Sequence, residues 1–198
     1  LSEEARKWWT LVAVSFGLFM IMLDNTVVNV ALPSMARDLG ADLSELEWIV
    51  TGYALTFAAL MLTGGKLADL LGRRLIFVAG LVIFTGASLA CGLAETEQFL
   101  IGARVVQGAG AALMNPATLS IIAATFPPRQ RGMAIGIWAG VSALALAIGP
   151  LVGGLLTQHL DWSWIFFVNV PVGIVAIVAS FVLIRESKDE SAEQRLDL

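Results

Sequence analysis

Two charged residues, Asp24 and Arg104, lie deep inside apolar stretches of the sequence. At 1.5 Å per helical residue, Asp24 lies about 13 Å from the break at Pro33, and Arg104 lies about 9 Å from Gln98, so the two can share one level. Burial favours the neutral acid, whereas a neighbouring arginine favours the carboxylate, so a modest rearrangement could load or release a proton. The pair therefore predicts a protonation switch, with a purely structural ion pair as the alternative.

Other polar side chains accompany these two charges. Asn25, Thr26 and Asn29 follow the acid on the same stretch, and Gln107 stands one turn after the arginine. We expect Gln107 to hydrogen-bond within the charged cluster. Asn25, Asn29 and the single tyrosine, Tyr53, are candidates to line a cavity, although packing or bonding to nearby backbone explains them equally well.

Enzymatic chemistry has little support in this sequence. His159 is the only histidine and Cys91 the only cysteine, so no intramolecular disulfide and no nucleophile–base pair are expected. We find no pattern for a metal cluster or a phosphate-binding loop, and the basic residues are scattered rather than gathered for nucleic acid. We therefore expect no enzyme, no metal, no cofactor and no nucleic-acid partner.

The amino-acid composition indicates whether water or lipid surrounds the folded chain. Hydrophobic residues make up 58% of the 198 residues and charged residues only 14%, with a mean hydropathy of +0.82. A soluble domain of this size could not hide so much apolar surface from water, so lipid must surround most of the chain. The net charge of −4 is less informative than the position of the charges.

Six stretches are long and apolar enough to span a bilayer, which predicts an all-α polytopic membrane protein. They are residues 8–32, 47–71, 75–94, 98–126, 131–159 and 164–184. We expect Pro33 to close the first helix and Pro127-Pro128 to separate the fourth from the fifth, because proline lacks an amide proton. The first stretch is too long for a signal peptide and should remain as a spanning helix.

The basic residues predict the orientation in the membrane. One side collects Arg6, Lys7, Lys66, Arg73, Arg74, Arg129, Arg131, Arg185, Lys188 and Arg195. The other side has Arg37 alone, among several acidic residues. Since basic residues concentrate in cytoplasmic loops, both ends of the chain are expected in the cytoplasm.

A weak internal repeat relates the two halves of the chain. A shift of 89 positions aligns residues 63–67 with 152–156 and residues 76–77 with 165–166. Two units of three helices have opposite orientations in the membrane, and inverted repeats of this kind are typical of secondary transporters. Chance similarity between apolar segments is the alternative.

Residues 23–33 read LDNTVVNVALP, and residues 104–112 read RVVQGAGAA. Both resemble signatures of drug:proton antiporters of the major facilitator superfamily, in the branch with fourteen spanning helices. The resemblance covers essentially the whole chain and implies the amino-terminal half of that fold. It also implies proton or cation handling at Asp24 and proton transfer at Arg104, with Gln107 beside them.

Residues 65–74 read GKLADLLGRR and resemble the superfamily's cytoplasmic-loop motif, except that Leu70 replaces a common basic residue. The resemblance implies a cytoplasmic gate, for which the motif residues are Gly65, Asp69, Gly72, Arg73 and Arg74. We expect Asp69 to receive either a helix amino terminus or an arginine. The alternative is that the two arginines only set the topology.

Residues 149–154 read GPLVGG and resemble the motif associated with antiporters, with Ala145 in place of a common glycine. We expect Ala145, Gly149 and Gly153 to form one stripe for close helix packing, and Pro150 to kink the helix. Gly154 completes the motif. A second glycine stripe runs along residues 132–140. Residues 162–173 resemble a sixth-helix signature of the fourteen-helix branch, and residues 195–198 look like the approach to a seventh helix.

The resemblance implies a secondary transporter that exports amphipathic or cationic drugs and toxic compounds in exchange for protons, and so contributes to antibiotic resistance. It also implies the cytoplasmic (inner) membrane of a bacterium as the location. Its partners would be lipid, protons, the small-molecule substrate and a missing carboxy-terminal half of the same polypeptide. We divide the chain into a six-helix bundle, 1–185, and a cytoplasmic linker, 186–198, and expect residues to precede Leu1. The alternatives are a proton symporter that imports a metabolite and a membrane scaffold that transports nothing.

Overall fold

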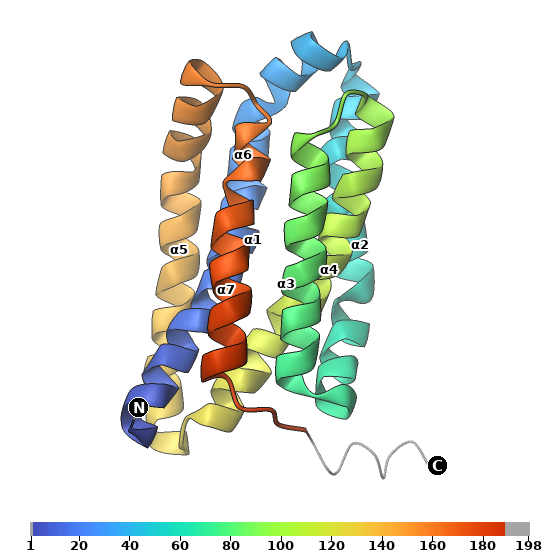
Figure 1. Cartoon of the computed structure of the whole chain (residues 1–198). Coiled ribbons are helices and arrows are strands. Elements are labelled where there is room, and N and C mark those ends of the chain that lie inside the picture. Colours follow the sequence, from blue (N-terminus) through green and yellow to red (C-terminus); the bar gives the residue numbers. More distant parts are fainter. Residues whose placement is uncertain (1, 189–198) are drawn as a thin grey trace, which may run out of the picture.

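The computed structural model describes residues 2–188, and these residues form an antiparallel helical bundle (Figure 1). Six segments are long and apolar enough to cross a membrane, as the sequence predicts. The helices are α1 (Glu3–Leu39), α2 (Leu43–Leu71), α3 (Arg73–Gly92), α4 (Glu97–Thr125), α5 (Pro128–His159), α6 (Trp164–Phe167) and α7 (Asn169–Leu183). The sixth span consists of α6 and α7 together.

The first helix is longer than the sequence predicts. It continues through Pro33 to Leu39, so the expectation that Pro33 closes it is wrong. Proline removes one backbone donor, and membrane proteins tolerate that loss inside a helix when its neighbours support the rest of the structure. The helix ends instead at Gly40, whose φ of 68° lies in the left-handed region that glycine adopts without a steric penalty.

Prolines also shape the fifth and sixth spans. The break between α4 and α5 lies at Phe126 and Pro127, and Pro128 occupies the first turn of α5, where a missing donor costs nothing. The fifth span therefore begins three residues before the predicted Arg131. The hydrogen-bond pattern of the sixth span is interrupted at Val168, close to Pro171, which has no amide proton to donate. The backbone of Val168 nevertheless stays right-handed helical.

The start of α1, the α2–α3 turn, the α4–α5 turn and the end of α7 lie together at one end of the bundle, which we call the terminal end (Figure 1). The turns α1–α2, α3–α4 and α5–α6 lie at the other end. Arg6, Arg73 and Arg185 are therefore at the terminal end, as the charge pattern predicts, and Arg37 is at the opposite end.

The helix packing agrees with two inverted three-helix units. Helix α2 packs closely on α4, and α5 packs on α1, so the middle helix of each unit lies against the first helix of the other. A Cβ at Gly64 of α2 would overlap the carbonyl of Ala112 on α4. A Cβ at Gly153 of α5, the equivalent position after a shift of 89 residues, would lie 3.2 Å from the Cα of Val27 on α1.

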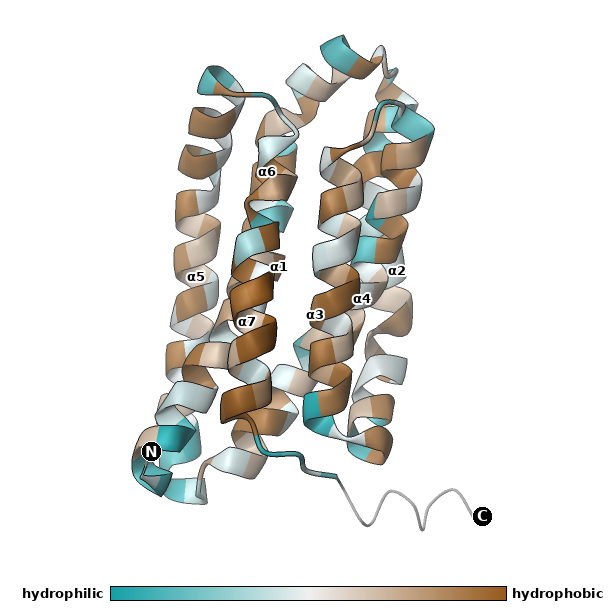
Figure 2. Ribbon diagram, viewed as in Figure 1, coloured by the Kyte–Doolittle hydropathy of each residue, from teal (hydrophilic) through white to brown (hydrophobic). Residues whose placement is uncertain are grey.

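Hydrophobic residues dominate the middle of the long helices, and hydrophilic residues gather toward the two ends of the bundle (Figure 2). In the most apolar windows of α2 and α5, only 17% and 11% of the residues are buried, compared with 67% for α1. These two helices thus present wide apolar faces that no other described residue covers. Inside, two apolar clusters lie along the helices, one toward each end, and on α1 they meet around Asp24.

Candidate functional site

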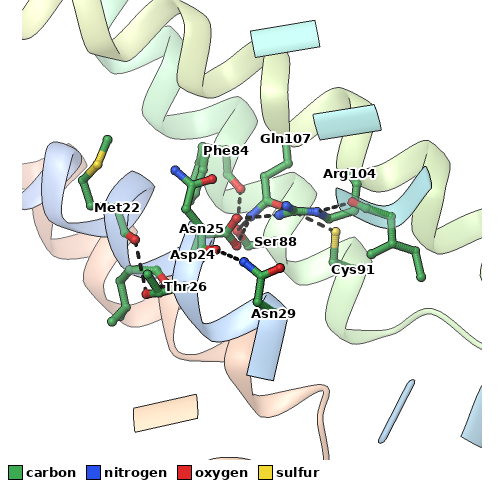
Figure 3. Close-up of polar contacts among 12 residues, drawn as sticks. Met22, Asp24, Asn25, Thr26, Asn29, Phe84, Ser88, Cys91, Arg104 and Gln107 are labelled. Atoms are coloured by element: carbon green, nitrogen blue, oxygen red, sulfur yellow. Dashed lines mark hydrogen bonds and ion pairs between the residues drawn. The ribbon is translucent and has the colours of Figure 1, made fainter. Parts of the chain in front are cut away.

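The two charges that the sequence places deep in the membrane form one ion pair inside the bundle (Figure 3). Asp24 comes from α1 and Arg104 from α4, and an Nη1–Oδ2 distance of 2.5 Å separates them. Asp24 is fully buried and Arg104 is 1% exposed. The shared level estimated from the sequence is therefore correct, and two helices from different repeat units are joined by a charge-assisted hydrogen bond.

Gln107 completes the coordination of the carboxylate. Its Nε2 donates to Oδ1 of Asp24 at 3.0 Å and to Oγ of Ser88 at 2.8 Å, while its Oε1 accepts from Nη1 of Arg104 at 2.6 Å. The Ser88 hydroxyl then donates to the carbonyl of Phe84 at 2.8 Å. Gln107 lies in the cluster as expected, whereas Ser88 was not predicted, because a serine inside an apolar stretch has no distinctive signal.

Cys91 also touches this cluster. Its side chain is fully buried. Its Sγ nevertheless lies 3.7 Å from Oε1 of Gln107, within reach of a weak S–H hydrogen bond. The amide oxygen of Gln107 thus receives donors from both α3 and α4.

Helix α2 closes the cluster from its other side. Nε of Arg104 donates to the carbonyl of Ile49 at 3.1 Å, and the guanidinium carbon lies 4.2 Å from the ring centroid of Tyr53. A ring face at that distance stabilises a cation. Tyr53 is only 2% exposed, so it covers the arginine instead of lining an open cavity in the described bundle. Phe166 lies on another side, at 5.8 Å.

Two of the polar residues that follow Asp24 on α1 bond to the backbone of their own helix. Nδ2 of Asn29 donates to the carbonyl of Asn25 at 2.8 Å, and the Thr26 hydroxyl donates to the carbonyl of Leu23 at 2.9 Å. Asn29 is exposed and Asn25 partly exposed, so both can face a space beside the bundle. Neither side chain contributes a hydrogen bond to the ion-pair cluster.

The predicted gate motif lies at the α2–α3 turn on the terminal end. Oδ1 of Asp69 accepts from Nε and Nη2 of Arg73 at 3.2 and 3.1 Å, so the acid pairs with an arginine, one of the two partners expected for it. Gly72 forms the turn with a φ of 128°, which disfavours any side chain. Gly65 packs against Pro116 of α4, and Arg74 bonds to the carbonyl of Ile184 at 3.2 Å.

The predicted antiporter motif forms a contact between α5 and α1. A Cβ at Gly149 would overlap the hydroxyl of Thr26, and Gly153 faces the backbone of Val27, so both glycines serve close packing. Gly154 has no neighbour within 4 Å, and the same holds for the glycines of the second stripe, Gly132, Gly136 and Gly140. Close packing is therefore confirmed for Gly149 and Gly153. The second stripe meets no described residue, so its packing role stays a prediction. Pro150 lies in the interior of a continuous helix.

The titratable residues form no group suited to a metal. Within residues 2–188, no cluster of three or more His, Cys, Asp or Glu side chains could hold an ion. The arrangement at the centre is instead a carboxylate with a donor on each oxygen, surrounded by apolar side chains. Such a site can hold a proton or a cation only when one of its internal partners is released.

Comparison with known sequences decides the family. Residues 14–196 match the Major Facilitator Superfamily. This chain belongs to the Major Facilitator Superfamily. The fold agrees, because a structure of a mutant of the peptide transporter POT in complex with sulfate superposes with a TM-score of 0.79 over 94% of this chain and 42% of that one, at 16% identity.

The superfamily members with similar sequences include several resistance proteins. The chain is 43% identical to the tetracenomycin C resistance and export protein of Streptomyces glaucescens, over 98% of this chain and 36% of that protein. It is 43% identical to the puromycin resistance protein pur8 of Streptomyces alboniger, over 98% of this chain and 39% of that protein. The chain thus spans well under half the length of these relatives.

Most of the site residues predicted from the sequence make side-chain or close packing contacts in the structure. Sequence reasoning missed Ser88, the carbonyl of Ile49 and Phe166, which complete the shell around the ion pair. Periodicity gives no signal for a backbone acceptor or an aromatic cover, since both depend on which helix becomes the neighbour. Residues 195–198, the predicted approach to a seventh helix, lie outside the described residues, and so does Arg195 of the basic set, which is the first of them.

Proposed function

We propose that this chain forms the first six-helix bundle of a proton-coupled antiporter that exports amphipathic or cationic toxic compounds. The observation that carries the proposal is the buried carboxylate of Asp24, held by Arg104 and Gln107 between the two repeat units. The similarity to resistance and export proteins supports the direction of transport and the class of substrate.

The hydrogen-bond pattern suggests how a proton would act. Each oxygen of Asp24 already accepts a donor, Arg104 at Oδ2 and Gln107 at Oδ1. A proton arriving at Oδ2 would meet the Nη1 hydrogen of Arg104, so the guanidinium has to withdraw. It would keep the carbonyl of Ile49, the amide oxygen of Gln107 and the face of Tyr53 as partners.

Protonation would therefore remove the charge-assisted contact between α1 and α4. A ligand shifts a conformational equilibrium only through different affinities for the two states, and this contact provides such a difference for the proton. The bundle would then rock against a second bundle around a cavity between them, as in other transporters with inverted repeats. A cationic substrate would bind when the acid is charged, so proton and substrate would alternate.

We further propose that the terminal end faces the cytoplasm. The positions of the basic residues support this orientation. Apart from the buried Arg104 and from Arg37, every described basic residue lies in the half of its helix nearer the terminal end or in the segment after α7. They are Arg6, Lys7, Lys66, Arg73, Arg74, Arg129, Arg131, Arg185 and Lys188. Basic residues favour the cytoplasmic side of a membrane.

The test is the substitution Asp24→Asn in the complete transporter that contains this chain, measured in proteoliposomes or inverted vesicles with an imposed proton gradient. The amide can still bond to Gln107 but cannot cycle a proton, so gradient-driven export of a cationic dye should be lost while the protein stays folded. Asp38→Asn, an exposed acid beyond the apolar part of the same helix, is the matched control and should retain export.

Undiminished export by Asp24→Asn would refute the proposal. The direction of movement in the same vesicles distinguishes the two transport classes. A symporter would accumulate substrate on the side toward which protons flow, whereas the proposed antiporter moves the substrate against the proton flow.

A further inference from the structure

Helix α3 begins without any cap from its own neighbourhood. Helices α1, α2 and α4 start at Ser2, Asp42 and Thr96, whose side chains accept from the backbone of the first turn. The residue before α3 is Gly72, which has no side chain to do this. The first backbone N–H groups of a helix have no partner within the helix, so those of α3 must be satisfied from elsewhere.

The segment that follows α7 satisfies them. The backbone N–H of Arg73 donates to the carbonyl of Ser187 at 3.0 Å. The next two amides, of Arg74 and Leu75, donate to Oε1 and Oε2 of Glu186, each at 3.0 Å. The amide of Ile76 then makes the first bond within the turn, to the carbonyl of Gly72 at 3.0 Å. Every free donor of the first turn is thus accounted for.

A carboxylate is well suited to this position. Its negative charge faces the positive end of the helix dipole of α3, and both of its oxygens accept from consecutive amides. Nε of Arg74 lies 3.8 Å from Oε2 of Glu186, which adds an ion pair between two side chains that are each about one-third exposed. The contact joins residues 112 and 111 positions apart in the sequence, so local pattern cannot reveal it.

The turn is also shaped to admit Glu186. A Cβ at Gly72 would lie 2.7 Å from both Cδ and Oε1 of Glu186, so a glycine is needed for space as well as for its φ of 128°. On its other side, the same segment bonds to α1. The carbonyl of Leu183 accepts from Nε of Arg6 at 3.2 Å and from the hydroxyl of Thr10 at 3.0 Å.

We propose that Glu186 is a positioning residue that caps α3 and holds the α2–α3 turn to the chain leaving the bundle. The second part of the inference rests on the proposed function. Residues 183–187 connect the start of α1 to the start of α3, and the following polypeptide continues from them. Movement of that polypeptide during the transport cycle is then transmitted directly to the turn that contains Arg73 and its partner Asp69.

The capping contact is tested by hydrogen–deuterium exchange of the complete transporter. Glu186→Ala should accelerate exchange of the Arg74 and Leu75 amides by about tenfold, the loss expected for a missing cap. The first turn of α4, capped by Thr96, should not change. Glu3→Ala is the matched control, because Glu3 pairs with Arg185 of the same segment at 2.5 Å but does not reach α3.

The positioning role is tested by transport kinetics. Glu186→Ala should lower the maximal rate while leaving the half-saturating substrate concentration unchanged, since the Asp24 cluster is intact. Glu186→Gln keeps one accepting oxygen. Its amide exchange rate and its maximal transport rate should therefore lie between those of the unmodified protein and those of Glu186→Ala.

Unchanged exchange in Glu186→Ala would overturn the cap, and faster exchange with an unaltered maximal rate would overturn the positioning role. Neither outcome depends on whether Asp24 carries the proton. Failure of the Asp24→Asn experiment would leave the exchange result in place, so the two proposals can fail separately.

Discussion

Replacing Arg104 by leucine should lower the free energy of unfolding by about 3–5 kcal/mol, the usual cost of removing one partner of a buried ion pair. The value rests on burial, because the two side chains are 2% and 0% exposed and their charged atoms lie 2.5 Å apart. The variant would leave the Asp24 carboxylate with Gln107 as its remaining bonded partner, at 3.0 Å.

The chain provides a control with the same distance and different burial. Arg185 and Glu3 also approach to 2.5 Å, but their side chains are 63% and 78% exposed. Solvent screens such a pair, so Arg185→Leu should change the free energy of unfolding by less than about 1 kcal/mol. The difference between the two variants isolates the contribution of desolvation.

The assay is unfolding of the purified complete transporter in a denaturing detergent titration, followed by tryptophan fluorescence. The double variant Asp24→Leu with Arg104→Leu should be more stable than Arg104→Leu alone, because it leaves no buried charge uncompensated. The reasoning is refuted if Arg104→Leu costs no more than Arg185→Leu, or if the double variant is as unstable as the single one.

Two further predictions concern helix packing and the gate turn. Gly64→Ala should destabilise the protein by about 1–3 kcal/mol, because the new methyl group would push α2 away from the carbonyl of Ala112. Gly86→Ala, in the interior of α3 with no neighbour within 4 Å, should not destabilise it in the same titration, because alanine favours a helix more than glycine does. Asp69→Asn should slow transport in proteoliposomes without reducing expression, because it weakens the pairing with Arg73; unchanged turnover would leave this turn with a role in topology alone.

The helical spans and the charge asymmetry follow from composition, because a bilayer imposes strong constraints on length and polarity. The boundaries follow less well. Pro33 does not end α1, since a single missing donor is tolerated within a helix that is supported on other sides. Near Pro171 the helical hydrogen-bond pattern of the sixth span is interrupted at Val168, but the backbone there stays right-handed helical, so the span is not divided.

The residues of the candidate site were also only partly predictable from the sequence. A carboxylate and a guanidinium in apolar stretches each need a partner, so Asp24 and Arg104 could be paired by depth alone. The sequence also indicates Gln107, because it lies one turn from the arginine. For Tyr53 the sequence left lining a cavity and packing open. Its ring centroid lies 4.2 Å from the guanidinium carbon of Arg104, and this placement follows from the packing of α2 on α4.

The sequence by itself determined that this is a membrane protein, how many segments can span the bilayer, and which charged residues require a partner. These are properties of each segment taken alone. Only the tertiary structure decided that Ser88 and the carbonyl of Ile49 complete the shell of the ion pair, and that Glu186 caps a helix 111 residues away. These contacts join segments far apart in the chain, and hydrogen-bond geometry between packed helices is not encoded in any local pattern.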